Sequence, residues 1–421
     1  MIAGASHLIS VGWNPAPRNS ASWIGKCFSA RHGSIRGVVE CGREASATLR
    51  LGAAIIFVLA LAASGCALLR KARSPGAASD GGFVETTTRT TDAAGSVEAA
   101  SVAQFEAPSV PAAPGQPSGP GSPRAPAFPA PFAIAFGPDG NMWFTEFGSN
   151  RIGRVTLSGD VTFFDLRPRG IPQRLTAGPD EALWFTDAAG NRIGRLGLDG
   201  SDLYVPVPTP GSGPAAIILG PGRDLWFTEH AGDRIARITP LGTITEFTLP
   251  GPGDPGGIAI GPDRHVYFTE SRGNRIDRMS LDGRVDEFPL RTPGSLPGNI
   301  VTGADGSLWF TELGTRKVGR LTTAGDVSEY TLPVNGAPLD ITVGPDGNVW
   351  VTVPRAHAIC RITPGGRSTA FYLSAEVFPS FIAMGADRNL WFTEPNGKIG
   401  RFSVDGTLTE FSLTSRAASG K

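Results

Sequence analysis

The sequence has few cysteines and no excess of charge of either sign. Its four cysteines, Cys27, Cys41, Cys66 and Cys360, are too few and too scattered for a disulfide framework or a zinc site. Its 38 basic and 38 acidic side chains give a formal net charge of zero, so the overall charge does not favour binding to nucleic acid. We therefore expect the folded part to be stabilised by its core, and we expect no nucleic-acid partner.

Charged residues are also scarce, at 18% of the chain, whereas glycine and proline are abundant, with 56 and 36 residues. So many turn-forming residues exclude a helical bundle, and a hydrophobic fraction of 40% excludes disorder of the whole chain. The composition therefore predicts an all-β protein with many short strands joined by tight turns.

One long apolar run lies between Arg50 and Arg70, LGAAIIFVLALAASGCALL, and its length is near the minimum for a membrane-spanning helix. The end of this run, Ala63-Ser64-Gly65-Cys66, resembles a bacterial lipobox, in which the cysteine receives lipid after cleavage of the signal peptide. We favour a lipoprotein signal with Cys66 as the lipidation site; the alternative is a plain N-terminal anchor helix. Either interpretation predicts an exported protein, anchored to the membrane at the bacterial cell envelope.

The composition changes several times along the chain. It predicts an upstream segment, a signal or anchor segment, a Pro/Ala/Ser-rich linker, a repeat domain and a tail, at residues 1–48, 49–66, 67–130, 131–415 and 416–421. The linker cannot bury enough apolar area to offset the entropy of ordering it, so we expect a disordered tether.

Two details of the N-terminal part stay open at this point. One hypothesis is that part of the upstream segment is not translated, because the true start is a non-ATG codon such as that of Val38 or Val39. Within the linker, VAQFEAP at residues 102–108 has the alternation of a strand and is a candidate for an additional outer strand.

From Pro131 onward the chain repeats with a period of 41 or 42 residues. One marker is an aromatic residue, at Trp143, Trp184, Trp226, Tyr267, Trp309, Trp350 and Trp391. A second marker is the proline that opens each copy, at Pro131, Pro172, Pro214, Pro255, Pro297, Pro338 and Pro379. Because the two markers keep the same spacing, the chain contains seven copies of one structural unit.

Each copy reads as four strands of five or six residues with short turns, which accounts for the period. Seven four-stranded sheets predict a seven-bladed β-propeller, because each sheet must be covered on both faces by its neighbours. The alternative is an open β-solenoid. The sequence does not decide whether LTEFSL (407–412) or residues 102–108 form the outermost strand of the last blade.

Residues that occur in nearly every copy are interpreted as architectural, because a site made once does not need its residues seven times. An acid follows the aromatic-Phe-Thr element in six copies: Glu146, Asp187, Glu229, Glu270, Glu312 and Glu394. An arginine ends the next strand in all seven: Arg154, Arg195, Arg237, Arg278, Arg320, Arg361 and Arg401. We expect acid–arginine pairs or backbone ties between these sets, and packing of the aromatic residues between blades.

The repeats GPDGNMWFTEFGSNRIGRV, GPGRDLWFTEHAGDRIARI and GADGSLWFTELGTRKVGRL resemble those of the streptogramin B lyase family, also called the virginiamycin B lyase family. The resemblance covers about residues 131–412. It implies a seven-bladed propeller and an elimination reaction, assisted by Mg²⁺, that opens the ester of a cyclic depsipeptide antibiotic. In such a reaction a base removes the proton α to the ester carbonyl while the metal stabilises the enolate.

The resemblance also implies histidines directly after the opening prolines of late repeats. The residues at these places are Phe132, Gln173, Ala215, Gly256, Gly298, Leu339 and Ser380, and none is histidine. The glutamate that the resemblance implies in the last repeat corresponds to Glu394, which lies at a position shared by most copies. Three histidines occur once each, His230, His265 and His357, and we expect solvated loop residues unless two of them share a face.

Ligands of propellers usually bind at one end of the central channel, where loops enter the innermost strands. The polar residues of these opening segments are Gln173, Arg174, Asn299, Asp340 and Ser380, and this polarity is not repeated in every copy. They are therefore our candidate ligand-binding residues. The alternative for Arg174 and Asp340 is a rim ion pair of little energetic value.

The sequence favours a binding module for a small molecule or an envelope protein at the channel mouth. One rival is a Mg²⁺-dependent lyase whose base has moved to another residue. Another is a metal-dependent lactone or ester hydrolase, which would need carboxylates and asparagines around a divalent cation. The sequence assigns no metal ligands and no cofactor other than Mg²⁺ for a lyase, and it leaves the oligomeric state undetermined.

Overall fold

A computed structural model describes residues 102–103 and 130–413 of the chain. The predictions for Cys66, for residues 1–48 and 49–66, and for most of the linker lie outside the described residues. Within the described part, no helix is both long and apolar enough to cross a membrane.

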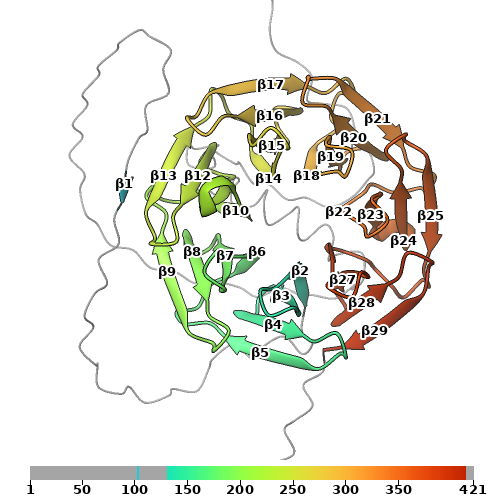
Figure 1. The fold of residues 1–421 in the computed structure, drawn as a ribbon, viewed down its shortest axis with the longest axis horizontal. Helices are drawn as coiled ribbons and strands as arrows, with labels where there is room; N and C mark the ends of the chain where they lie inside the picture. The colour runs from blue at the N-terminus through green and yellow to red at the C-terminus, as the bar shows by residue number, and fades with distance from the viewer. Residues whose placement is uncertain (1–101, 104–129, 414–421) are drawn as a thin grey trace, which may run out of the picture. The chain divides into compact units, whose positions relative to one another are not determined.

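Seven antiparallel four-stranded sheets follow one another around a ring, which confirms the prediction of a seven-bladed β-propeller (Figure 1). The first three blades consist of β2 (Pro131–Phe136), β3 (Met142–Glu146), β4 (Arg151–Val155), β5 (Val161–Asp165); β6 (Pro172–Ala177), β7 (Leu183–Asp187), β8 (Arg192–Leu196), β9 (Asp202–Pro206); and β10 (Pro214–Leu219), β11 (Leu225–Glu229), β12 (Arg234–Ile238), β13 (Ile244–Thr248). A short 3₁₀ turn, η1 (Pro221–Arg223), joins β10 to β11.

The other four blades have the same order of strands, from the centre outward. They consist of β14 (Pro255–Ile260), β15 (Val266–Glu270), β16 (Arg275–Met279), β17 (Val285–Pro289); β18 (Pro297–Thr302), β19 (Leu308–Glu312), β20 (Lys317–Leu321), β21 (Val327–Thr331); β22 (Ile341–Val343), β23 (Val349–Val353), β24 (Ala358–Ile362), β25 (Ser368–Tyr372); and β26 (Ile382–Met384), β27 (Leu390–Glu394), β28 (Lys398–Phe402), β29 (Leu408–Ser412). A second 3₁₀ turn, η2 (Pro354–Ala356), joins β23 to β24.

The outermost strand of the last blade is β29, which settles the question that the sequence left open. The strand β1 (Val102–Ala103) instead pairs with β13, at the outer edge of the third blade. The first and last blades therefore each consist of four consecutive strands, and the ring is closed by contacts between them.

Packing between blades explains the repeated aromatic residue. All seven copies of this residue are at least 98% buried. Each one belongs to a hydrophobic cluster with residues of the following blade, as Trp143 does with Leu175 and Phe185, and Trp391 with Ile134 and Phe144. The structure thus confirms packing of the aromatic residues between blades, where burial of each large side chain contributes on the order of 2 kcal/mol.

The strand register determines which charges pair, and it corrects one expectation. Trp143 lies opposite Arg154, whereas Glu146 lies opposite Arg151. Accordingly, Glu146 forms an ion pair with Arg151, with an N···O distance of 2.7 Å. The N···O distances of the corresponding pairs Arg192–Asp187 and Arg275–Glu270 are 2.7 and 2.5 Å. In three blades the acid therefore pairs with the residue that begins the third strand, and not with the repeated arginine near the end of that strand, whereas the lysines that begin this strand in the fifth and seventh blades pair with Glu329 and Glu410.

The repeated arginine, which is the fourth residue of each third strand, pairs instead with an aspartate of the turn before the second strand. These pairs, at 2.5 to 3.9 Å, are Arg154–Asp139, Arg195–Asp180, Arg237–Asp224, Arg278–Asp263, Arg320–Asp305, Arg361–Asp346 and Arg401–Asp387. In six blades the same aspartate also accepts the aromatic N–H or O–H, as from Trp143 Nε1 at 2.8 Å. In the third blade the acid is shifted to Asp224, and the buried Nε1 of Trp226 has no hydrogen-bond partner among the described residues.

Candidate functional site

The segments that open the inner strands pair irregularly with the second strands. In the first five blades the pairing with the second strand shifts by a bulge between the opening proline and the third residue after it. In the last two blades regular pairing begins only at Ile341 and Ile382. Because a bulge redirects side chains and interrupts a ladder, the residues just after the proline are free of strict alternation.

A threonine of each second strand fixes these segments in place. Its Oγ1 accepts the N–H of the second residue after the proline of its own blade, at 2.9 to 3.2 Å. It donates to the carbonyl of the first residue after the proline of the next blade, at 2.6 to 3.4 Å. The seven threonines are Thr145, Thr186, Thr228, Thr269, Thr311, Thr352 and Thr393. This threonine belt joins all the blades, and our sequence analysis missed it, although the invariant Thr of the repeat is visible in the sequence.

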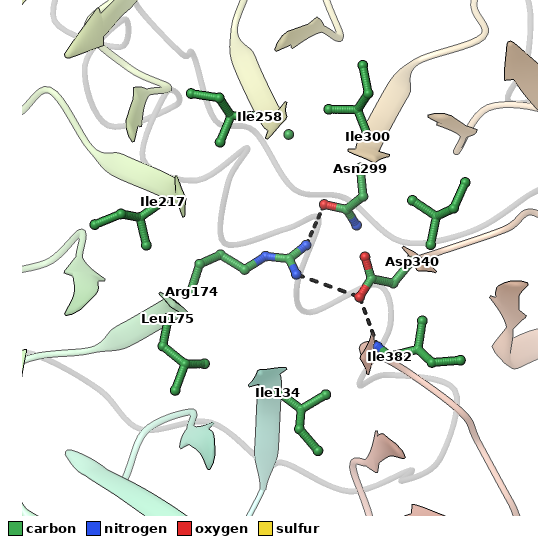
Figure 2. Close-up of a pocket in the computed structure, with 11 residues that line it drawn as sticks. Ile134, Arg174, Leu175, Ile217, Ile258, Asn299, Ile300, Asp340 and Ile382 are labelled. Carbon is green, nitrogen blue, oxygen red and sulfur yellow. Dashed lines mark hydrogen bonds and ion pairs between the residues drawn. The ribbon is translucent and has the colours of Figure 1, made fainter. Parts of the chain in front are cut away.

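Arg174, from β6 of the second blade, crosses the channel toward the fifth and sixth blades (Figure 2). Its NH2 donates to Oδ1 of Asn299, and its NH1 lies 3.7 Å from Oδ2 of Asp340. These three residues follow the opening prolines of three different repeats at the same place, two residues on. The structure thus brings together three of the five candidate residues.

Both partners of Arg174 are held by backbone groups. Asn299 donates from Nδ2 to the carbonyl of Leu339 at 3.0 Å. Oδ2 of Asp340 accepts the N–H of Ile382 at 2.9 Å. The Asp340 side chain is 7% exposed and that of Arg174 is 24% exposed, so the arginine keeps access to the channel mouth.

The guanidinium of Arg174 also stacks on an aromatic ring. Its Cζ lies 4.2 Å from the centroid of the Phe381 ring, which in turn packs edge-on against Phe132 at 4.4 Å. Burial lowers the pKa of Arg174, and the charge of Asp340 opposes this effect. Burial likewise raises the pKa of Asp340, against the influence of Arg174. Each charge therefore opposes the effect of burial on the pKa of the other.

Directly beside these polar groups lies a ring of aliphatic side chains, one from each blade. These are Ile134, Leu175, Ile217, Ile258, Ile300, Ile341 and Ile382, and we call them the aliphatic collar. With Arg174, Asn299, Asp340 and Gly257 the collar residues line a cavity of about 150 Å³ that is open to the channel. The sequence analysis did not single out the collar or Phe381, although the collar position, three residues after each opening proline, is aliphatic in every copy.

Gln173 and Ser380, the other two candidates, do not line this cavity. The carbonyl oxygens of both residues accept hydrogen bonds from the threonine belt. The Ser380 side chain is buried and contacts the carbonyl of Phe378 at 3.3 Å. Both residues therefore have contacts within the scaffold and lie outside the cavity.

Two of the three unrepeated histidines share a face. His230 follows β11 and His357 precedes β24, so both lie at the end of the ring where the inner strands begin, whereas His265 lies in a turn at the other end. Nδ1 of His230 is 3.3 Å from the carbonyl of Pro255, and Nδ1 of His357 is 3.0 Å from that of Val377. Neither ring lines the cavity, and each contacts the opening segment of the next blade.

Several buried acids of the second and third strands have perturbed pKa values, and none of these acids lines the cavity. Burial, reinforced by the neighbouring Glu246, raises the pKa of Glu229 to about 8. Burial and the neighbouring Glu410 raise the pKa of Glu394 to about 7, and burial with Glu270 raises that of Asp277 to about 8. These values come from the enclosed position of the acids between strands.

The residues at the cavity do not fit a Mg²⁺ ion. Asp340 is the single carboxylate among the residues that line it, and it already faces the guanidinium of Arg174. Across residues 102–103 and 130–413, no three side chains of His, Cys, Asp or Glu form a group that could hold a metal. Mg²⁺ prefers several oxygen ligands, with carboxylates among them, so neither the metal-assisted lyase nor the metal-dependent hydrolase gains support from this donor set.

These features define a seven-bladed β-propeller whose unrepeated polar residues meet at one end of the central channel. The sequence profile of the virginiamycin B lyase family matches residues 123–254 and 251–420, and the chain belongs to this family. No curated protein sequence matched the chain significantly.

Solved structures agree with this assignment. A streptogramin B lyase structure is 36% identical over 68% of this chain and 95% of that chain, with a TM-score of 0.63. Virginiamycin B lyase from Staphylococcus aureus is 35% identical over 65% of this chain and 94% of that chain, with a TM-score of 0.62. A catalytically inactive histidine-to-alanine variant of that enzyme with quinupristin is 35% identical over 60% and 87%, with a TM-score of 0.57.

Proposed function

We propose that this chain is a binding module that takes up a small molecule at the channel mouth where Arg174, Asn299 and Asp340 converge. The observation that carries the proposal is the convergence itself. Three polar residues that break the repeat, from three blades, surround one cavity whose other side chains are aliphatic. The propeller fold does not require polar residues at this position, because the other four blades have Ala, Gly or Phe there: Ala133, Ala216, Gly257 and Phe381.

The aliphatic collar provides a direct test. The six isoleucines of the collar can be labelled at their δ1 methyl groups and observed by NMR while fragments of varied charge and polarity are added. Binding at the mouth shifts these methyl signals saturably, and combined replacement of Arg174, Asn299 and Asp340 by Ala removes the shifts. If no fragment shifts a collar methyl, the binding proposal is wrong.

Opening of a streptogramin ring is the second candidate function, and similarity to the lyases supports it. Against it stands the absence of histidine at the seven places after the opening prolines. The test is incubation of residues 126–421 with quinupristin and Mg²⁺, followed by mass spectrometry of the depsipeptide. Ring-opened product would establish a lyase, whereas intact quinupristin that shifts the collar methyls would support binding without turnover.

Anchoring of this module at the bacterial cell envelope is part of the same proposal. It rests on the apolar run that ends in Ala63-Ser64-Gly65-Cys66. Lipid on Cys66 predicts that Cys66→Ala releases the protein into the soluble envelope fraction. Continued membrane association of this variant would instead support the plain anchor helix.

A further inference from the structure

The hydrogen-bonding groups around the cavity are unevenly satisfied. Asn299 uses both ends of its amide, toward Arg174 and toward the carbonyl of Leu339. Oδ2 of Asp340 accepts the N–H of Ile382. A guanidinium has five N–H donors, and the 3.7 Å between Arg174 NH1 and Asp340 Oδ2 exceeds the usual length of a hydrogen bond. Besides Oδ1 of Asp340, the groups left for a ligand are therefore the remaining donors of Arg174.

We propose that the cavity recognises a carboxylate group of the ligand, with Arg174 as its partner. This inference rests on the proposed binding function and specifies the ligand class. The planar fork of a guanidinium matches the two oxygens of a carboxylate, and such bidentate pairs are stronger than neutral hydrogen bonds. Stacking on Phe381 and the bond to Asn299 hold the plane of the fork before the ligand arrives.

Charge and size limit the ligand to a singly charged, compact head group. Asp340 lies beside the guanidinium and repels anions. Its repulsion of a dianion such as hydrogen phosphate is about twice its repulsion of a monoanion at the same distance. A cavity of about 150 Å³ is comparable to one that holds benzene, so it accepts a carboxylate with a few carbon atoms. The remainder of a larger ligand stays outside the cavity.

Asp340 competes with the ligand for Arg174 in this arrangement. When the carboxylate binds, it shares the guanidinium with Asp340. Removing the charge of Asp340 while keeping its shape therefore frees the guanidinium for the ligand. A purely structural ion pair makes no such prediction, since the same change would only weaken the fold.

The experiment uses butyrate as the carboxylate probe, butyramide as its neutral counterpart and inorganic phosphate as the dianion, each titrated into the protein with labelled isoleucines. We expect butyrate to shift the collar methyls and the Arg174 Nε–H signal saturably. Asp340→Asn binds butyrate at least about tenfold more tightly, because a charge-assisted bond no longer has an internal competitor. Arg174→Gln loses saturable binding, and Arg174→Lys, which keeps the charge without the fork, binds more weakly than wild type.

Arg192→Gln is the matched control, because Arg192 is paired with Asp187 in the same blade but does not line the cavity. It should leave butyrate binding unchanged. Butyramide binding as tightly as butyrate, phosphate binding more tightly than butyrate, or weaker butyrate binding by Asp340→Asn would each overturn the carboxylate inference. Collar shifts with butyramide alone would still support the binding function, whereas an absence of shifts with every fragment would remove both proposals.

Discussion

Thr393 of the seventh blade donates a hydrogen bond from Oγ1 to the carbonyl of Phe132 in the first blade, at 2.7 Å. Arg401 adds a second tie across the same junction, to the carbonyl of Leu157 at 3.0 Å. The other six junctions also have a covalent connection through the chain, whereas at this one the described residues join the first and last blades through side-chain hydrogen bonds and packing.

Thr393→Val should therefore loosen the ring at its closure. The change keeps the shape but leaves a buried carbonyl and the N–H of Phe381 without their partner, which costs roughly 1–3 kcal/mol. Hydrogen exchange measured by mass spectrometry should become faster in β2 and β26. The control is Thr228→Val at an interior junction, where the covalent connection limits the opening. Equal exchange patterns in the two variants would contradict a weak closure.

The third blade offers a repair of the repeat. Gly222 and Arg223 occupy the places of Asp139 and Gly140 in the first blade, and both have positive φ, at 77° and 68°. The double change Gly222→Asp with Arg223→Gly restores the turn sequence of the first blade and provides an acceptor for the buried Nε1 of Trp226. We expect a gain of about 1 kcal/mol in the free energy of unfolding, measured by urea denaturation. The control is Asp305→Ala in the fifth blade, which removes the same acceptor from Trp309 and should lower the free energy of unfolding. If the double change in the third blade also lowered the free energy of unfolding, the native turn with Asp224 would be the more stable one.

Much of this fold could be predicted from sequence, because the period of the aromatic residues and prolines is set by the geometry of a four-stranded blade. The expected partner of Glu146 was wrong because the repeat shows which residue types recur but does not show which residues lie opposite each other on neighbouring strands. Cross-strand pairing places Glu146 opposite Arg151 and Trp143 opposite Arg154, and only a known hairpin offset reveals this.

The candidate site was predictable in part for a similar reason. Arg174, Asn299 and Asp340 break the repeat at one equivalent place, so the sequence identified them, and ring closure brings them together. Gln173 and Ser380 also break the repeat, yet each lies one residue earlier, where the backbone carbonyl serves the threonine belt. A shift of one residue in a bulged segment changes which side chain faces the channel, and alternation alone does not fix this.

Glu229 should make stability fall as the pH rises. Its pKa is about 8 in the folded protein, raised by burial and by Glu246 above an ordinary value of 4.5. The folded state therefore holds a proton that the unfolded state releases, so the contribution of this group is full below about pH 4.5 and is lost as the pH passes 8. Glu229→Gln should remove this slope and unfold with a free energy on the order of 1–3 kcal/mol higher than wild type at pH 9, with a smaller difference at pH 5. Chemical denaturation across this pH range measures it, and a wild-type advantage that grows with pH would contradict the assignment.

Gly257 connects the packing of two blades to the cavity. A Cβ at this position would lie 2.5 Å from the carbonyl oxygen of Gly298 and 2.8 Å from Cα of Asn299, both rigid backbone atoms of the fifth blade. Gly257→Ala should therefore push β14 and β18 apart, at a cost of roughly 1–3 kcal/mol in the free energy of unfolding.

The neighbouring Gly256 provides the matched control for this change. A Cβ there meets Thr269 Oγ1 at 3.2 Å and stays 3.8 Å from the carbonyl of Gly298, so Gly256→Ala should cost much less. Because Gly257→Ala displaces Asn299, it should also weaken any ligand that shifts the collar methyls, whereas Gly256→Ala should not. Equal melting temperatures for the two variants would show that the blades separate easily, and a destabilised Gly257→Ala protein with unchanged ligand affinity would show that Asn299 does not orient Arg174 for binding.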